Sequence, residues 1–306
     1  MRPRSLVLAS IATSLITCAL LAGTPRANAQ AEAVSAKERA AFHQDPQWAM
    51  IAPHLPDPKT ATAAKLELAG DVLRARRFPE DSLDYYGYAI ARGGPVSELL
   101  NKMGIVRLEL RQNALAHELF QQSVRAHKKD ASGWNNLGVT EYLDQRYRSA
   151  ISDYRRAAKI DKTSATYHTN MGMAYFENKD MESARQQFSQ ALLLDPHAFD
   201  RRDSGGITAQ VVGTQNYSQL CFEMAKLYAR NKNDAATLLW LAKATEAGYD
   251  TKYEMSRDTA LRIYVKDPRV ILMLKNAQQM RMRSVAAAKP AQSLGTGISP
   301  DQMHVD

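Results

Sequence analysis

A constant interval between glycines runs through the middle of the chain and constrains its fold more than any other feature. The glycines are Gly70, Gly104, Gly138 and Gly172, which are equally spaced. A small residue follows each glycine by 12 positions and an aromatic residue by 16, giving the columns Ser82, Ala116, Ala150, Ala184 and Tyr86, Phe120, Tyr154, Phe188. Columns that keep register over four copies indicate one structural element of about 34 residues repeated in tandem.

Each repeat is predicted to contain two helices. Apolar residues recur three and four positions apart within each half, which is the period of an amphipathic helix. The predicted breaks between the two helices lie near Arg76-Arg77, Gln112-Asn113, Gln145-Arg146 and Lys179-Asp180. A single helical hairpin cannot bury its apolar face alone, so neighbouring repeats must stack. The sequence therefore predicts an all-α fold, an α-solenoid of stacked helix–turn–helix repeats.

The third and fourth repeats carry a recognisable motif. The third reads Trp134-Asn135-Asn136-Leu137-Gly138, followed by Tyr142, Tyr147, Ala150, Tyr154 and Ala157, and the fourth has Met171-Gly172, Tyr175, Ala184, Phe188, Ala191 and Asp195-Pro196. This pattern resembles the tetratricopeptide repeat family, in its exported bacterial type. The third repeat departs from it, because Lys162 stands where the closing proline is expected. The resemblance implies a protein-binding scaffold that is not an enzyme.

The repeat register sets the expected domain boundaries. Four repeats in strict register occupy 63–96, 97–130, 131–164 and 165–198, and an N-terminal cap segment precedes them at 30–62. After them we expect an irregular insertion at 199–216, a degenerate fifth repeat at 217–250, C-terminal capping helices at 251–283 and a disordered tail at 284–306. The tail is assigned because its Ala, Pro, Gly and Ser residues show no periodicity.

The N-terminus has the pattern of a secretory signal peptide at 1–29. Arg2 and Arg4 precede an apolar run over 6–22, and Ala27-Asn28-Ala29 supplies a small-x-small cleavage site. Two alternatives are an uncleaved membrane anchor, for which the run is at the short limit, and a lipoprotein modified at Cys18. We expect no transmembrane segment after signal removal and an exported protein, periplasmic or secreted.

Composition and motifs point away from catalysis and from nucleic acid. Removing Arg2, Arg4 and Arg26 with the signal lowers the formal net charge from +8 to about +5, which is too modest to favour a nucleic-acid partner. Cys221 would then be the only cysteine, and we expect it to be a buried structural thiol. The seven histidines show no metal-ligand spacing, and phosphate-loop and nucleophile-elbow motifs are absent, so we predict no catalytic residues, no metal and no cofactor.

The expected partner is a protein or a peptide. The family resemblance implies a concave groove lined by the first helix of each repeat, and the corresponding residues here are Asn101, Lys102, Asn135, Asn136, Val139, Tyr142, Thr169, Asn170, Met173 and Phe176. Asn136 and Asn170 are one repeat period apart, and an amide can both donate to and accept from a peptide backbone.

This spacing predicts an asparagine ladder that holds an extended peptide; the alternative is two solvated asparagines. Tyr142 and Phe176 would supply apolar pockets beside the ladder or simply pack between helices. The alternative function is a structural or assembly subunit of a cell-envelope or secretion complex. The oligomeric state does not follow from the sequence.

Overall fold

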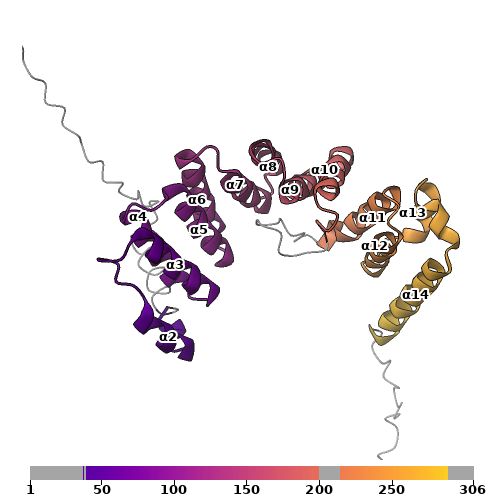
Figure 1. Cartoon of the computed structure of the whole chain (residues 1–306). Helices are drawn as coiled ribbons and strands as arrows, with labels where there is room; N and C mark the ends of the chain where they lie inside the picture. The colour runs from indigo at the N-terminus through magenta and orange to yellow at the C-terminus, as the bar shows by residue number, and fades with distance from the viewer. Residues whose placement is uncertain (1–36, 38, 200–213, 289–306) are drawn as a thin grey trace, which may run out of the picture. The chain divides into compact units, whose positions relative to one another are not determined.

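The computed structural model describes residues 37, 39–199 and 214–288 (Figure 1). Within these ranges the chain forms helices and turns and no strand, so the predicted all-α fold is confirmed. The predicted signal peptide at 1–29 lies outside the described residues, as do 200–213 of the predicted insertion and 289–306 of the predicted tail. The helices divide between two compact units, Met1–Leu99 and Leu100–Asp306.

The N-terminal unit is one helical hairpin with a cap. Its elements are α2 (Pro46–Ile51), the 3₁₀ helix η1 (Ala52–His54), α3 (Ala63–Ala75) and α4 (Pro79–Ala91). The His43 ring stacks on Trp48 with centroids 3.7 Å apart, and Trp48 in turn lies 5.1 Å from the ring of Phe78. His43 Nε2 also lies 3.0 Å from a carboxylate oxygen of Asp81 in α4. These contacts fix the cap on the hairpin.

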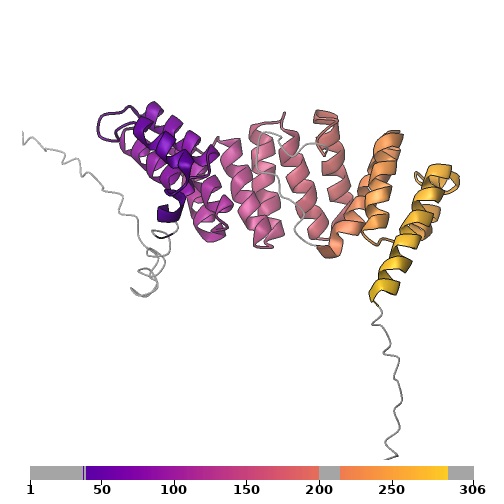
Figure 2. The same ribbon diagram turned by 90° about the horizontal axis from the view of Figure 1, so that it is seen from below.

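The C-terminal unit contains the other repeats. Its elements are most of α5 (Val96–Glu109), then α6 (Asn113–Ala126), α7 (Ala131–Leu143), α8 (Tyr147–Ile160), α9 (Ala165–Glu177), α10 (Met181–Leu194), α11 (Thr214–Arg230), α12 (Asp234–Glu246), α13 (Thr251–Arg257), η2 (Arg262–Lys266) and α14 (Pro268–Ala288). Helices α7, α8, α9 and α10 lie side by side in chain order (Figure 2). Each of these four helices packs on the next, as stacked hairpins require.

One left-handed residue makes the turn inside each hairpin. Arg77, Arg111, Gln145 and Lys179, again one repeat period apart, have φ between 59° and 65°. In each case the next residue donates its N–H to the carbonyl five positions earlier, over 2.8–2.9 Å. This 6→1 bond closes the first helix and is the Schellman motif that a left-handed residue permits. The turns coincide with the breaks expected from the sequence.

Lys232 repeats the same turn in the fifth hairpin, with φ of 56°. It lies more than one repeat period after Lys179, and Ala225 and Leu241 follow Gly172 and Phe188 at the same enlarged interval. Both are fully buried. The fifth hairpin thus keeps the internal plan of the others and is displaced by an extra stretch of chain, over which the sequence register is lost.

Two boundaries differ from the sequence expectation. Helix α11 begins at Thr214, so the last residues of the predicted insertion are helical. Helix α14 runs to Ala288, and therefore the predicted disordered tail is wrong for 284–288. The reason is composition, because residues 286–288 are three consecutive alanines and alanine has the highest helix propensity of any residue type.

The glycine column is explained by the aromatic column of the same repeat. A Cβ on Gly70, Gly104, Gly138 or Gly172 would lie 2.4–2.7 Å from the ring of the aromatic residue 16 positions later. These four rings are at most 2% exposed and cannot move aside. The first helix therefore needs a residue without a side chain at the point where the aromatic ring of the second helix packs against it.

Two tyrosines of the aromatic column should respond in opposite ways to loss of their hydroxyl. The buried Tyr154 Oη has no hydrogen-bond partner in the described part of the chain, whereas Tyr86 Oη donates to Asp71 Oδ1 over 2.8 Å. An unsatisfied buried hydroxyl costs free energy, so Tyr154→Phe should leave the free energy of unfolding unchanged or raise it by up to about 1 kcal/mol. Tyr86→Phe should lower it by about 1–2 kcal/mol. Urea unfolding of both variants checks this, and equal losses would contradict it.

Asp153 in α8 should make stability fall as the pH rises. Burial raises the pKa of its carboxyl from 3.8 to about 6, with Arg156 opposing the shift and Glu141 adding to it. Because the folded chain holds this proton more tightly than the unfolded chain, stability is lost as the pH rises from about 4 to about 6. Discounted for partial solvation, the loss is about 1–2 kcal/mol. Unfolding curves at pH 4 and 7 should show Asp153→Asn gaining on the wild type at pH 7; an equal difference at both pH values would contradict this assignment.

Candidate peptide-binding face of the first helices

The residues expected to contact a ligand lie on α5, α7 and α9, the first helices of the second, third and fourth repeats. Lys102 is half-buried. The other nine are no more than 8% exposed, namely Asn101, Asn135, Asn136, Val139, Tyr142, Thr169, Asn170, Met173 and Phe176. In this structure these side chains are therefore packed, and the groove they would line stays a prediction.

Four of the nine are apolar and belong to one hydrophobic cluster, namely Val139, Tyr142, Met173 and Phe176. The Tyr142 ring lies 5.5 Å from that of Tyr147 on the following helix. Burial is also the main reason that the pKa of the Tyr142 hydroxyl lies above its ordinary value. These four residues are thus part of the buried core of the array, and their role as ligand pockets stays a prediction.

The asparagines form a chain of hydrogen bonds across three helices. Asn170 Nδ2 donates to Asn135 Oδ1 over 2.8 Å, and Asn135 Nδ2 donates to Asn136 Oδ1 over 3.0 Å. Asn136 Nδ2 then donates to Asn101 Oδ1 over 2.9 Å. We call these four residues the asparagine chain. All its donors point the same way, from α9 through α7 to α5.

The asparagine chain ends on a helix cap. Asn101 Nδ2 donates to Ser132 Oγ over 3.3 Å, and Ser132 Oγ donates to Asp130 Oδ1 over 2.8 Å. That same carboxylate oxygen accepts the backbone N–H of Ser132 over 3.0 Å and caps the start of α7. The last acceptor is thus a charged group at a helix N-terminus, where negative charge is favourable.

The bonds between helices join residues 35 positions apart, one more than the repeat period. Asn101 and Asn135 occupy one column of the repeat, and Asn136 and Asn170 occupy the next. An amide in the first column accepts from the second column of the following repeat. Two amide columns side by side, as in Asn135-Asn136, are the sequence signal that could have indicated this connection.

No cluster of three or more His, Cys, Asp or Glu side chains suited to a metal ion is found among the described residues. Cys221 is fully buried in α11, and burial raises the pKa of its thiol. Within the same ranges, every helix falls short of the length and apolar character that crossing a bilayer needs.

A family model described as tetratricopeptide repeat matches residues 165–198. This range is the fourth repeat, which contains the α9–α10 hairpin, the Gly172–Phe188 contact and the left-handed turn at Lys179. These residues form a tetratricopeptide repeat. The other hairpins repeat the same turn, and the first three also repeat the same glycine–aromatic contact, so the array extends well beyond the matched range.

Curated relatives resemble parts of this array. A chloroplastic tetratricopeptide repeat domain-containing protein, PYG7 of Arabidopsis thaliana, is 29% identical over 112 residues, covering 34% of this chain and 37% of the relative. The NatA auxiliary subunit N-alpha-acetyltransferase 16 of Mus musculus is 26% identical over 99 residues, covering 32% of this chain and 12% of the relative. The chain thus spans well under half the length of either relative.

Solved structures resemble larger parts of the chain. The pilF protein of Pseudomonas aeruginosa has a TM-score of 0.49 and 14% identity, over 74% of this chain and 93% of that one. MamA from Desulfovibrio magneticus RS-1 has a TM-score of 0.44 and 17% identity, over 67% and 99%. YrrB, described as a TPR protein with an unusual peptide-binding site, has a TM-score of 0.42 and 16% identity, over 72% and 98%.

Proposed function

We propose that this tetratricopeptide array is a non-enzymatic scaffold that holds a protein or peptide segment against α5, α7 and α9. Arrays of this family generally act by binding other proteins, and that general role is the part the family membership supports. The finer proposal rests on one observation, the asparagine chain, which aligns four amides across these three helices. Amides can pair with both polar groups of a peptide backbone.

A segment that binds at this face would replace hydrogen bonds that the asparagines already make to each other, because these side chains are not solvated. Asn136 and Asn170 already bond to other amides in the array. An extended segment would substitute its backbone groups for some of these partners, an exchange of similar bonds with a small net free energy. Lys102 is half-buried at the α5 end and would favour an acidic group in the segment.

Peptide selection tests this proposal. A displayed random-peptide library should yield segments that bind the full chain, and Lys102→Glu should weaken their binding at least about tenfold, because the proposed interface includes this lysine. Arg125→Glu, an exposed change of the same sign on α6, is the matched control. Failure to enrich any peptide, or equal affinity of the two variants, would contradict binding at the first helices.

Export is a further part of the proposal, and the N-terminal pattern supports it. Arg2, Arg4, the apolar run and Ala27-Asn28-Ala29 are the features that a signal peptidase substrate needs. We therefore expect N-terminal sequencing of the protein from its native host to begin at Gln30. A sequence that begins at Met1 would favour an anchored or internal protein, and a lipid on Cys18 would favour the lipoprotein alternative.

The second candidate is a structural or assembly subunit of an envelope or secretion complex, and the C-terminal end favours it. Ile263 is 75% exposed, and on α14 Leu272 and Met280 are 58% and 70% exposed. Residues 251–283 also carry eight Lys and Arg against three acids. Exposed apolar side chains among basic ones suit a protein interface. Loss of a co-purified complex in Leu272→Asp but not in Lys102→Glu would favour this function.

A further inference from the structure

The first helix of the array, α3, exposes a face that is buried in the later repeats. Val72 is 42% exposed, while Val106, Thr140 and Ala174, which occupy its position in the second, third and fourth repeats, are all fully buried. Leu68 is 63% exposed, while Asn136 and Asn170, its equivalents in the third and fourth repeats, are 3% and 0% exposed. The exposed side chains of α3 thus belong to the stacking face of a repeat.

On α7 of the third repeat, helices of the preceding repeat cover this face. At the position of Val72, Thr140 Oγ1 lies 2.9 Å from His117 Nδ1 of α6, a helix of 14 residues, and at the position of Leu68, Asn136 donates to Asn101 of α5. Leu137 on α7 packs in one cluster with Phe120 and Val124 of α6. A Cβ built on Gly133 would lie 3.1 Å from Val124 Cγ1 and 3.2 Å from Ser123 Oγ. Gly133 holds the repeat position that Lys65 holds on α3. A helix docked on α3 in the manner of α6 would therefore place its residue equivalent to Ser123 against Lys65.

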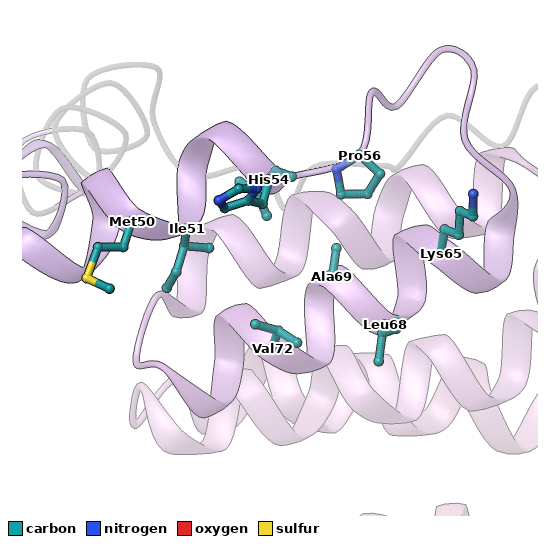
Figure 3. Close-up of a pocket in the computed structure, with 9 residues that line it drawn as sticks. Met50, Ile51, His54, Pro56, Lys65, Leu68, Ala69 and Val72 are labelled. Atoms are coloured by element: carbon teal, nitrogen blue, oxygen red, sulfur yellow. The ribbon is translucent and has the colours of Figure 1, made fainter.

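On α3 the same place is taken by the cap, which is too short to fill it. Helix α2 has six residues and η1 three. Between them and α3 lies a hollow of about 410 Å³, with Met50, Ile51 and His54 on the cap side and Lys65, Leu68 and Val72 on α3. Figure 3 shows the two sets of side chains along the edges of this hollow. Its walls are apolar except at His54 and Lys65.

We propose that this hollow, together with Leu68 and Val72, docks an amphipathic helix of another protein. The helix presents apolar residues three and four positions apart, as α6 does with Phe120 and Val124, and an acidic residue where it meets Lys65. The evidence for a helix is that a helix covers the equivalent face inside the array. This surface lies in the N-terminal unit and shares no residue with the face proposed above for peptide binding.

Charge argues against a second copy of this chain as the occupant. The obvious apolar helix on another copy is α14, which exposes Ile271 and Leu272. Over 268–280 it carries Arg269 and Lys275 and no acidic residue, so it would bring like charge to Lys65. Like charges at an interface lower affinity and select against that partner.

Two helical probes test the proposal through a reversal of charge preference. Both are helix-stapled peptides of residues 113–126, one with Ser123→Glu and one with Ser123→Lys. We expect the glutamate peptide to bind the full-length chain about twofold to fivefold more tightly than the lysine peptide, as an exposed ion pair allows. On the Lys65→Glu chain the order of the two peptides should reverse.

Aspartate substitutions at exposed leucines locate the binding surface. Leu68→Asp should weaken both peptides at least about tenfold, because it buries a charge against the docked helix. Leu193→Asp, at a leucine of α10 that is 79% exposed, should bind like the wild type. The proposal is overturned if neither peptide binds, if Leu68→Asp binds normally, or if the order of affinities does not reverse. Self-association that Leu68→Asp abolishes would replace the foreign helix with a second copy.

Discussion

Asn135→Ala should lower the free energy of unfolding by about 2–4 kcal/mol, the largest effect that we expect from one polar side chain. Asn135 is fully buried, donates to Asn136 and accepts from Asn170. Truncation removes the bond to the Asn136 oxygen and the bond from the Asn170 amide, and the loss of a bond by a buried polar group costs about 1–3 kcal/mol. The gain in helix propensity from alanine offsets only a few tenths of a kcal/mol.

Urea unfolding followed by circular dichroism measures this loss. Asn276→Ala, at an exposed asparagine inside α14, is the matched control and should change the free energy by no more than about 0.5 kcal/mol. Asn101→Ala, at the end of the asparagine chain, should cost less than Asn135→Ala because fewer amide bonds within the chain are lost. Equal stability of the Asn135 and Asn276 variants would show that the asparagine chain does not stabilise the stack.

Gly172→Ala should lower the free energy of unfolding by about 1–3 kcal/mol, although alanine is the better helix former. Its Cβ would lie 2.4 Å from Cε1 of Phe188, whose ring is only 2% exposed. The ring or the helix must shift, and the free-energy cost of repacking a dense interior exceeds the gain in helix propensity from alanine.

Gly87→Ala is the control with the opposite sign. Gly87 lies inside α4, and a Cβ there meets nothing within 4 Å. We expect this variant to gain about 0.5–1 kcal/mol from the lower entropy of its unfolded chain. Thermal melts of both variants check the pair. A stabilised Gly172→Ala would mean that the glycine column is not imposed by the aromatic rings.

The repeat plan was predictable from the sequence because it depends on local periodicity. Glycine and aromatic columns at a fixed spacing identify the hairpins, and the breaks at Arg77 and Lys179 follow from where the apolar pattern shifts. The fifth hairpin was harder to place, since its register is displaced between Phe188 and Leu241. The continuation of α14 past Ser284 was missed because an alanine run has no amphipathic pattern.

The candidate site was less predictable, because burial depends on how the helices stack. Asn136 and Asn170 share one column, which suggested a ladder of equivalent amides facing a ligand. In the structure each of them donates to the neighbouring column of the preceding repeat, one position beyond the repeat period. That offset depends on the relative positions of α5, α7 and α9, which no single helix encodes. The hollow beside α3 likewise depends on how a short cap fits a longer helix.

Site-specific photo-crosslinking tests the central claim, that a protein or peptide segment binds against the first helices, most directly. A photoreactive residue at position 102 on α5 is compared with one at position 125 on α6 of the same repeat, each in the full chain in its native host. We predict a crosslinked protein partner from position 102 and none from position 125. A partner captured from position 125 and not from position 102 would contradict the account and move the binding surface to the second helices.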